Sequence, residues 1–220
     1  MNSTEILEVF RDEMQDVETP YLWSDLAIYR YLDDAQKMFC RLTEGIEDSS
    51  TPAVCRLAIT AGTDWYPLSP KVLKVREAVD VVTGCPYGIM NMEKASLNGV
   101  HFNGNPGPLK LFVTGLEKGK LRAWPMPAED SVVELRVFRL PLARITDAGD
   151  QNLEIDEQHH NALLLWMKHL AFSKQDAETF DKGKVVPPEY ANWLETNLKF
   201  HFLDDSGISL NAIDGSAYNV

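Results

Sequence analysis

The spacing of apolar residues changes twice along this chain of 220 residues. Over residues 24–45 they recur every three or four positions, which is the period of an amphipathic helix. Over residues 54–140 they alternate in short runs separated by Gly, Pro and Asn, as strands and turns do. The helical spacing returns after Asp156. Helical segments at both ends with strands between them predict an α+β fold.

The first long helix has both a start and a stop signal. Ser24 is a good N-cap, Asp25 places a negative charge in the first turn, and Gly45 is suited to ending the helix. One face is apolar along the whole length, so this helix needs a packing partner. The apolar stripe consists of Ile28, Tyr31, Leu32, Ala35, Met38, Phe39 and Leu42.

Three further helices are expected. A short one starts at Ser3 or Thr4 and ends near residue 17, and a very apolar one follows Asp156. We expect the apolar helix to pack on the stripe of the first long helix, so that the two ends of the chain clasp each other. A helix over residues 189–202 precedes a tail without basic residues or periodicity, which we expect to be unfolded in isolation.

These patterns predict a mainly helical α+β fold. It is an antiparallel helical bundle with an inserted small antiparallel β-module and an extended C-terminal arm. We assign residues 1–46 to the N-terminal helices, 47–145 to the β-module, and 146–186 to the long core helix that completes the bundle. Residues 187–220 are the C-terminal helix and docking arm.

Charge and cysteine usage argue against several classes of function. The net charge of −12 has the wrong sign for a surface that grips nucleic-acid phosphates. The three cysteines form no CxxC pair, which favours buried reduced thiols over a zinc site. The N-terminus lacks the basic and apolar regions of a signal peptide, and the longest apolar run, residues 162–167, is too short to cross a bilayer. We therefore expect no membrane association.

No motif for catalysis or metal binding is complete. His159 and His160 are adjacent, so on a helix they diverge and cannot ligate one metal as an i,i+4 pair would. The acidic residues 147–156 lack the order of a calcium loop. We expect no enzymatic activity, catalytic residue, metal or cofactor. Two alternatives stay open: a metal-dependent hydrolase built from scattered side chains, and a β-module that binds a carbohydrate or another small molecule. The aromatic residues that could line such a groove are Trp65, Tyr66 and Trp124.

Three segments resemble the head–tail adaptor proteins of tailed bacteriophages, also called connector or head completion proteins. The first long helix of that family, with its Trp-Ser-Asp start and acidic-Ala pair, is similar to "LWSDLAIYRYLDDAQKMFCRL". Its β-segment, a Pro-x-Pro turn and a strand ending on Arg-Leu-Pro, is similar to "LRAWPMPAEDSVVELRVFRLPLARI". Its second long helix is similar to "LEIDEQHHNALLLWMKHLAFSKQDAETFD". The matching residues are Trp23, Ser24, Asp25, Asp34, Ala35, Pro125, Pro127, Arg139, Leu140, Pro141, His160, Ala162, Leu163, Trp166 and Met167.

This resemblance implies a structural virion protein at the head–tail interface, made in the host cytoplasm. Adaptors of this family form a twelve-fold ring below the portal, extend the channel through which the genome is ejected, and present a surface for tail assembly. The implied partners are the portal protein, a tail or nozzle protein and copies of the chain itself, while genomic DNA passes without specific binding.

The C-terminal segments of such adaptors commonly dock on the portal, and here that role would fall to the residues after Gly183. A closed ring also needs two different contact faces on each subunit. We expect Val132 and Phe138, which alternate outward along their strand, to belong to one of these faces. The expected docking residues of the arm are Tyr190, Trp193, Leu194, Leu198, Phe202, Ile208, Leu210, Ile213 and Tyr218.

Overall fold

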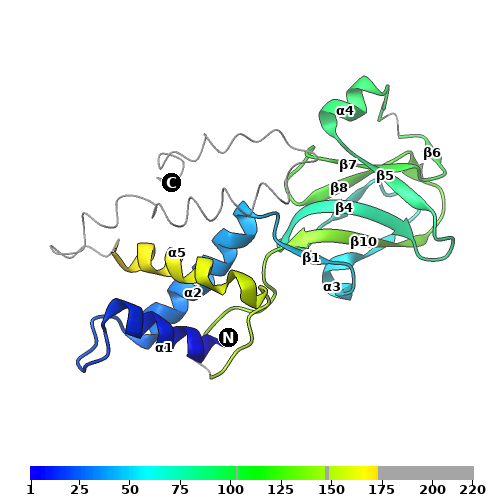
Figure 1. Cartoon of the computed structure of the whole chain (residues 1–220). Coiled ribbons are helices and arrows are strands. Elements are labelled where there is room, and N and C mark those ends of the chain that lie inside the picture. Colours follow the sequence, from blue (N-terminus) through cyan, green and yellow to red (C-terminus); the bar gives the residue numbers. More distant parts are fainter. Residues whose placement is uncertain (103, 147–148, 173–220) are drawn as a thin grey trace. The chain divides into compact units, whose positions relative to one another are not determined.

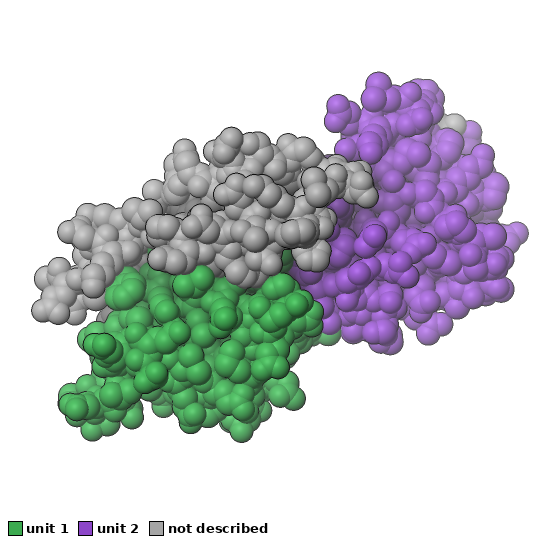
Figure 2. All heavy atoms as spheres, in the orientation of Figure 1, with its two compact units in different colours: residues 1–43, 141–220 green, residues 44–140 purple. Residues whose placement is uncertain are grey.

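The computed structural model describes residues 1–102, 104–146 and 149–172. The chain divides into two compact units, which Figure 2 shows in two colours. The helical unit comprises residues 1–43 together with the chain from residue 141 onward, and the sheet unit comprises residues 44–140.

The helical unit contains α1 (Ser3–Met14), α2 (Asp25–Leu42), a 3-10 turn η1 (Glu157–His159) and α5 (His160–Phe172). Helix α2 packs against α5, and α1 contacts both (Figure 1). The expected clasp between the first long helix and the apolar helix near residue 160 is therefore present within this unit. Among the described residues, none of the helices combines the length and apolar character needed to cross a bilayer.

Capping explains where the helices of this unit begin. Asn2, rather than Ser3 or Thr4, caps α1 and forms a reciprocal capping box with Glu5. Ser24 caps α2 as predicted, since its hydroxyl accepts a hydrogen bond from the Ala27 N–H (3.3 Å). Trp23 before this cap and Ile28 after it are both buried, which is the arrangement of a hydrophobic staple. The core between the helices includes Ile6, Phe10, Ile28, Leu32, Phe39, Leu163 and Met167.

The sheet unit is built on a curled eight-stranded sheet with the order β1-β10-β4-β5-β7-β8-β3, and β2 also pairs with β10. All pairs are antiparallel except β5 with β7, whose parallel pairing requires the crossover that contains α4. The strands are β1 (Ile46–Asp48), β2 (Arg56–Ile59), β3 (Trp65–Pro67), β4 (Val72–Asp80), β5 (Pro86–Asn91), β7 (Leu111–Thr114), β8 (Lys120–Trp124) and β10 (Ser131–Arg139). The other elements are α3 (Pro52–Cys55), α4 (Met92–Leu97) and a small parallel pair, β6 (Pro106–Gly107) with β9 (Met126–Pro127).

The sheet has to curl because of its chain connections. Strand β2 pairs at one side of the sheet and β3 lies at the opposite edge, yet only residues 60–64 join them. Such a short segment cannot cross a flat sheet of this width. The Tyr66 hydroxyl fastens the connection: it donates to the Thr63 carbonyl (2.6 Å) and accepts from the Thr60 N–H (3.3 Å).

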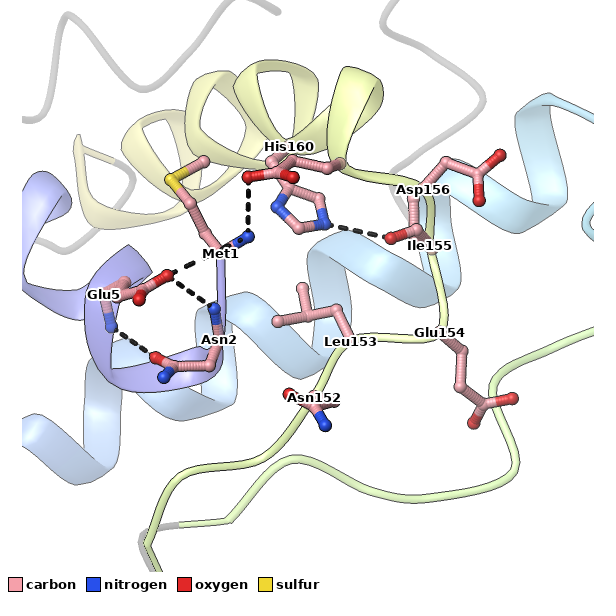
Figure 3. Close-up of a pocket in the computed structure, with 10 residues that line it drawn as sticks. Met1, Asn2, Glu5, Asn152, Leu153, Glu154, Ile155, Asp156 and His160 are labelled. Carbon is pink, nitrogen blue, oxygen red and sulfur yellow. Dashed lines mark hydrogen bonds and ion pairs between the residues drawn. The ribbon is translucent and has the colours of Figure 1, made fainter.

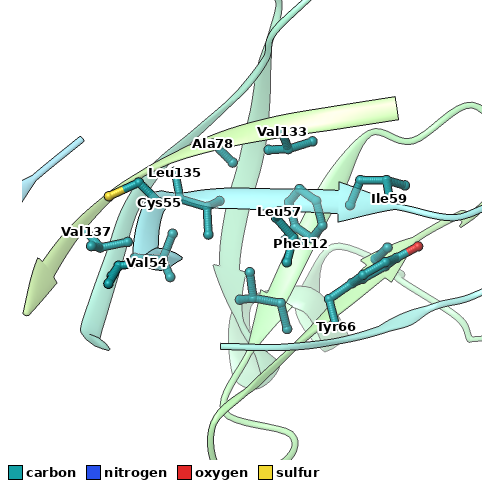
Figure 4. Close-up of a cluster of buried hydrophobic side chains, with 13 residues drawn as sticks. Val54, Cys55, Leu57, Ile59, Tyr66, Ala78, Phe112, Val133, Leu135 and Val137 are labelled. Atoms are coloured by element: carbon teal, nitrogen blue, oxygen red, sulfur yellow. The ribbon is translucent and has the colours of Figure 1, made fainter. Parts of the chain in front are cut away.

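Alternate residues of the strands face the inside of the curl, where they form one core (Figure 4). Strand β7 is buried on both faces, because Phe112 points into this core while Leu111 and Val113 pack beneath α4. The buried core consists of Val54, Cys55, Leu57, Ile59, Tyr66, Val75, Ala78, Phe112, Leu121, Ala123, Val133, Leu135 and Val137.

A buried ion pair joins the two ends of the sheet unit. The Arg139 guanidinium contacts the Asp48 carboxylate. This carboxylate also accepts hydrogen bonds from the Thr51 hydroxyl (2.6 Å) and the Ser50 N–H (2.9 Å). Burial disfavours the charged form of Asp48, but hydrogen bonds from Thr51, Ser50 and Arg139 outweigh it and hold the pKa of this carboxyl well below its ordinary range. Burial and the adjacent Asp48 charge raise the pKa of the Cys55 thiol to about 11.

The prediction of a mainly helical protein built on an antiparallel bundle is wrong. In the described part of the chain, helices hold 33% of the residues and the dominant element is the curled eight-stranded sheet. The strands were visible as short alternating runs, but their period does not show which of them pair. Strand β10 pairs with three other strands, β1, β2 and β4. Segments that look like separate hairpins in the sequence therefore belong to one sheet.

Candidate interaction surfaces

The turn between β4 and β5, residues 81–85, is called the hairpin tip below. Asp80, the last residue of β4, fixes its shape. The carboxylate of Asp80 accepts hydrogen bonds from the backbone N–H groups of Val82 (3.0 Å) and Thr83 (2.7 Å) and from the hydroxyl of Tyr87 (3.1 Å). Hydrogen bonds from the backbone and side chain of Thr83 hold the pKa of Asp80 below its ordinary value. The tip is therefore held in one conformation by a charged group.

The hairpin tip presents aliphatic side chains to solvent. Val82 is 88% exposed and Val81 is nearly half exposed. The Val81 N–H donates to the carbonyl of Val132 (3.0 Å), so the predicted contact residue Val132 lies beside the tip and is itself half-buried. No Asp, Glu, Lys or Arg occurs over residues 81–92. The hairpin tip thus exposes Val81 and Val82 beside the half-buried Val132, and residues 81–85 themselves carry no charged side chain.

Helix α4 also exposes apolar side chains of the sheet unit. It begins directly after β5, where the Asn91 side chain caps it by accepting the Lys94 N–H (2.8 Å). Ala95 packs the helix against the sheet, because it is fully buried against side chains of β7 and of the loop that follows α4. Its solvent side exposes Leu97, which is 82% accessible, between the exposed charged residues Glu93 and Lys94, and Met92 is exposed in the first turn. Helix α4 is therefore anchored on one face, and its other face combines one large apolar side chain with two charged ones.

In the helical unit a buried arginine shapes the turn between α1 and α2. The Arg11 guanidinium donates to the Asp16 carboxylate (2.7 Å) and the Trp23 carbonyl (3.0 Å), and it forms an ion pair with Asp25. The Tyr21 ring lies over it, with 3.8 Å between the guanidinium carbon and the ring centroid. One side chain thus holds both ends of the turn.

The same turn exposes apolar side chains in an acidic surrounding. Val17 is 60% exposed, and Tyr21, Leu22 and Leu26 are roughly half exposed. The sequence between Arg11 and Arg30 contains five carboxylates and no basic residue. This charge distinguishes the turn from the uncharged hairpin tip.

A hollow of about 490 Å³ lies between the start of α1 and residues 152–157 (Figure 3). The Met1 ammonium pairs with Glu157 (3.0 Å), and its hydrogen bond and positive charge lower the pKa of that carboxyl. The buried His160 ring has one nitrogen, Nε2, 2.9 Å from the Ile155 carbonyl oxygen. Over residues 1–102, 104–146 and 149–172, no group of three or more His, Cys, Asp and Glu side chains could hold a metal ion. The hollow therefore offers polar groups without a metal-binding arrangement.

Of the three aromatic residues that could line a ligand groove, one lies on the opposite face of the sheet from the other two. Tyr66 is buried inside the core, whereas its neighbour Trp65 points to the opposite face of the sheet. There the Arg122 guanidinium lies over the rings of Trp65 (5.0 Å) and Phe102 (4.0 Å). Trp124 packs against the cluster under α4. Trp65 and Trp124 thus lie on one face of the sheet, linked through Arg122 and Phe102, while Tyr66 lies on the other face.

The two predicted contact residues on β10 differ in accessibility. Val132 lies beside the hairpin tip, but Phe138 is only 9% exposed, and the Arg76 guanidinium lies 5.8 Å from its ring centroid. Phe138 does alternate outward as expected, yet charged side chains cover that face. The exposed residues Val82 and Leu97 were not among the predicted contact residues. A signal for Val82 existed, since it directly precedes the Thr83-Gly84 turn, where side chains point away from the sheet.

The predicted docking residues of the arm, Tyr190, Trp193, Leu194, Leu198, Phe202, Ile208, Leu210, Ile213 and Tyr218, lie outside the described residues.

One comparison with known proteins gives a match. The family model described as SU10 adaptor protein matches residues 1–193, which include the whole of the sheet unit and the described part of the helical unit. No curated protein sequence matches the chain.

Proposed function

The chain belongs to the SU10 adaptor protein family, and from this premise we propose that it forms a ring below the portal of a tailed bacteriophage. The family is a phage head–tail adaptor family, so the chain is a structural component of the virion. The proposed twelve-fold ring extends the DNA channel and provides the surface to which a tail or nozzle protein attaches. The family match over residues 1–193 is the observation that carries the proposal.

The proposal assigns the portal contact to the C-terminal arm, residues 187–220. The sequence of this segment repeatedly places aromatic and aliphatic side chains among polar ones, and no Lys or Arg follows Lys199. Ordering such a segment costs conformational entropy, which burial of its apolar side chains on a partner surface can offset. Apolar pockets on the portal would supply that surface.

Removing the arm tests the portal contact. The full chain and a chain truncated after Lys182 are each mixed with purified portal, and the products are imaged by electron microscopy. We expect rings on the portal with the full chain and none with the truncated chain. Trp193→Ala should weaken the association and Asn192→Ala, its matched control, should not. Equal binding by the full and truncated chains would remove the arm from the portal contact.

We propose that DNA passes through the channel without binding to its wall. With a net charge of −12, repulsion between the ring and the phosphates would keep the genome from adhering. We expect no measurable binding of duplex DNA to the assembled ring at physiological salt in a sedimentation assay. Tight binding under these conditions would contradict a passive channel.

The proposal also assigns Val132 and Phe138 to the contact between neighbouring subunits. Val132 is supported by its place beside the exposed hairpin tip. Phe138 would contribute only if the Arg76 side chain moves aside. Substituting each residue by Asp and counting assembled rings separates the two, and we expect the Val132 variant to assemble less well.

A further inference from the structure

We propose that the hollow between α1 and residues 152–157 binds a cationic side chain, an arginine or a lysine, of a partner protein. The inference goes beyond the proposed ring and does not depend on it. All residues that line the hollow belong to the helical unit, so one compact unit forms the whole site.

The first argument is a buried hydrogen-bond acceptor in the hollow. His160 begins α5 and lines the hollow with a residue exposure of only 3%. Its Nε2 lies 2.9 Å from the Ile155 carbonyl oxygen, and a carbonyl can only accept, so the proton of the neutral ring is on Nε2. Nδ1 then presents a lone pair, and within the part of the chain that the structure describes no group donates to it. Figure 3 shows this nitrogen on the Met1 side of the ring. Such a buried acceptor favours a ligand that donates a hydrogen bond.

The second argument is charge. Four carboxylates line the hollow, those of Glu5, Glu154, Asp156 and Glu157, and the lining contains neither Lys nor Arg. The Met1 ammonium pairs with Glu157 (3.0 Å) and lies 3.9 Å from Glu5, which leaves a surplus of negative charge. Glu154 and Asp156 extend away from the imidazole ring and act on it only at longer range (Figure 3). A concave surface with charges of one sign attracts groups of the opposite sign.

The third argument is the chemistry that these groups share. An imidazole lone pair and carboxylate oxygens all accept hydrogen bonds, and the side chains of Arg and Lys are cations that only donate them. The side chains of Glu5 and Glu157 are 58% and 76% exposed, so a side chain of another protein can reach them from solvent. A metal ion is a poorer candidate, because the described residues contain no group of ligands that could hold one.

Capped amino acids test this chemistry directly. Nα-acetyl-arginine amide and Nα-acetyl-lysine amide carry their charge on the side chain alone. Nα-acetyl-citrulline amide has nearly the shape of the arginine probe but no charge. Each probe is titrated at low ionic strength into the isotope-labelled full chain, while NMR follows the ring nitrogens of His160. We expect saturable shifts of Nδ1 with both cationic probes, and binding of the citrulline probe that is weaker by about fivefold or more. The tighter of the two cationic probes identifies the preferred side chain.

A charge-removing substitution provides the second test. Glu157→Gln should weaken both cationic probes by about threefold, as expected for an exposed ion pair, and should leave the citrulline probe unaffected. Glu8→Gln is the matched control, because Glu8 is an exposed residue of α1 that does not line the hollow. It should leave the affinity of every probe unchanged. Circular dichroism checks that both variants keep the fold.

The outcomes separate this site from the proposed ring. Shifts of Nδ1 that do not saturate, or equal binding of the arginine and citrulline probes, would overturn the cation site. Equal losses in Glu157→Gln and Glu8→Gln would do the same, because they would indicate attraction to the acidic chain as a whole. None of these results bears on the ring, which assembly on the portal tests.

Discussion

The two units each contain a buried arginine, and the two arginines differ in how far away their partners lie along the chain. In the helical unit Arg11 binds Asp16, Trp23 and Asp25, all within fourteen residues. In the sheet unit Arg139 binds Asp48, which is 91 residues away. The first arginine shapes a local turn, while the second joins the beginning of a unit to its end.

Two arginines that are equally buried can therefore differ in how much their contacts depend on the rest of the fold. The turn held by Arg11 connects two helices that also pack through their own cores. The pair of Asp48 with Arg139 forms only after β1 has aligned with β10, so it depends on a long closed loop. We therefore expect damage at Arg11 to remain local and damage at Arg139 to spread through the sheet unit.

The largest effect is expected from Arg139→Met. This change leaves the Asp48 charge buried without its cation, which should lower the free energy of unfolding by about 3–5 kcal/mol. Urea unfolding measures the loss, and hydrogen exchange should rise across β1 and β10. Arg136→Met on the same strand is the control, because Arg136 is half exposed and should cost less than about 1 kcal/mol. Equal losses would contradict a special role for the buried pair.

Gly45→Ala comes next. Gly45 has φ +92°, and an added Cβ would lie 2.7 Å from the backbone oxygen of Arg139. Left-handed strain and this clash together should cost roughly 2–3 kcal/mol. Gly62→Ala is matched, because φ is also positive (+76°) but nothing lies within 4 Å, so about 1 kcal/mol is expected. Equal melting temperatures of Gly45→Ala and Gly62→Ala would mean that the backbone at Arg139 shifts at little cost to make room for the added methyl group.

Arg11→Met leaves the buried Asp16 carboxylate without its cation, although Asp16 keeps hydrogen bonds from the Leu22 and Trp23 N–H groups, so the loss should be about 2–3 kcal/mol. The partner Asp25 is largely exposed and can be solvated again, so the ion pair with it adds little. Hydrogen exchange should increase over residues 15–25 and stay unchanged in the sheet unit. Exchange that rises in both units would remove the contrast between a local and a long-range arginine.

The smallest effect concerns pH. Because the pKa of Asp48 is lower in the folded than in the unfolded chain, the unfolded chain takes up the proton first as the pH falls. This stabilisation is complete above about pH 5 and declines below it, by at most about 1.4 kcal/mol per pH unit. Urea unfolding at several pH values should show a shallower acid decline in Asp48→Asn than in the wild type. Parallel curves would show that other carboxylates dominate.

Much of the helical unit was predictable because its information is local. The N-cap at Ser24, the stripe of α2 and the apolar face of α5 follow from residues within a few turns of one another. The alternation that marks β10 was equally visible, and Val133, Leu135 and Val137 face the core as expected. The sequence also predicted the phage adaptor family, and the family match over residues 1–193 confirms this prediction.

The contact surfaces were less predictable. Val132 and Phe138 alternate on one strand with the same phase, yet one lies beside an exposed tip and the other beneath an arginine. Alternation determines which face a side chain occupies but not what covers that face. Leu97 lies in a region predicted to hold only strands and turns, and its exposure became clear only once α4 was seen packed on β7.

The amino-acid order alone determined the helices of the helical unit, the alternation of the strands and the phage adaptor family, but not α3 and α4. Only the tertiary structure decided that the strands form one curled sheet, that Asp48 meets Arg139, and that the hairpin tip and α4 stand at opposite ends of β5. The physical reason is that periodicity arises from neighbours in sequence, whereas strand pairing and burial depend on groups brought together from far apart.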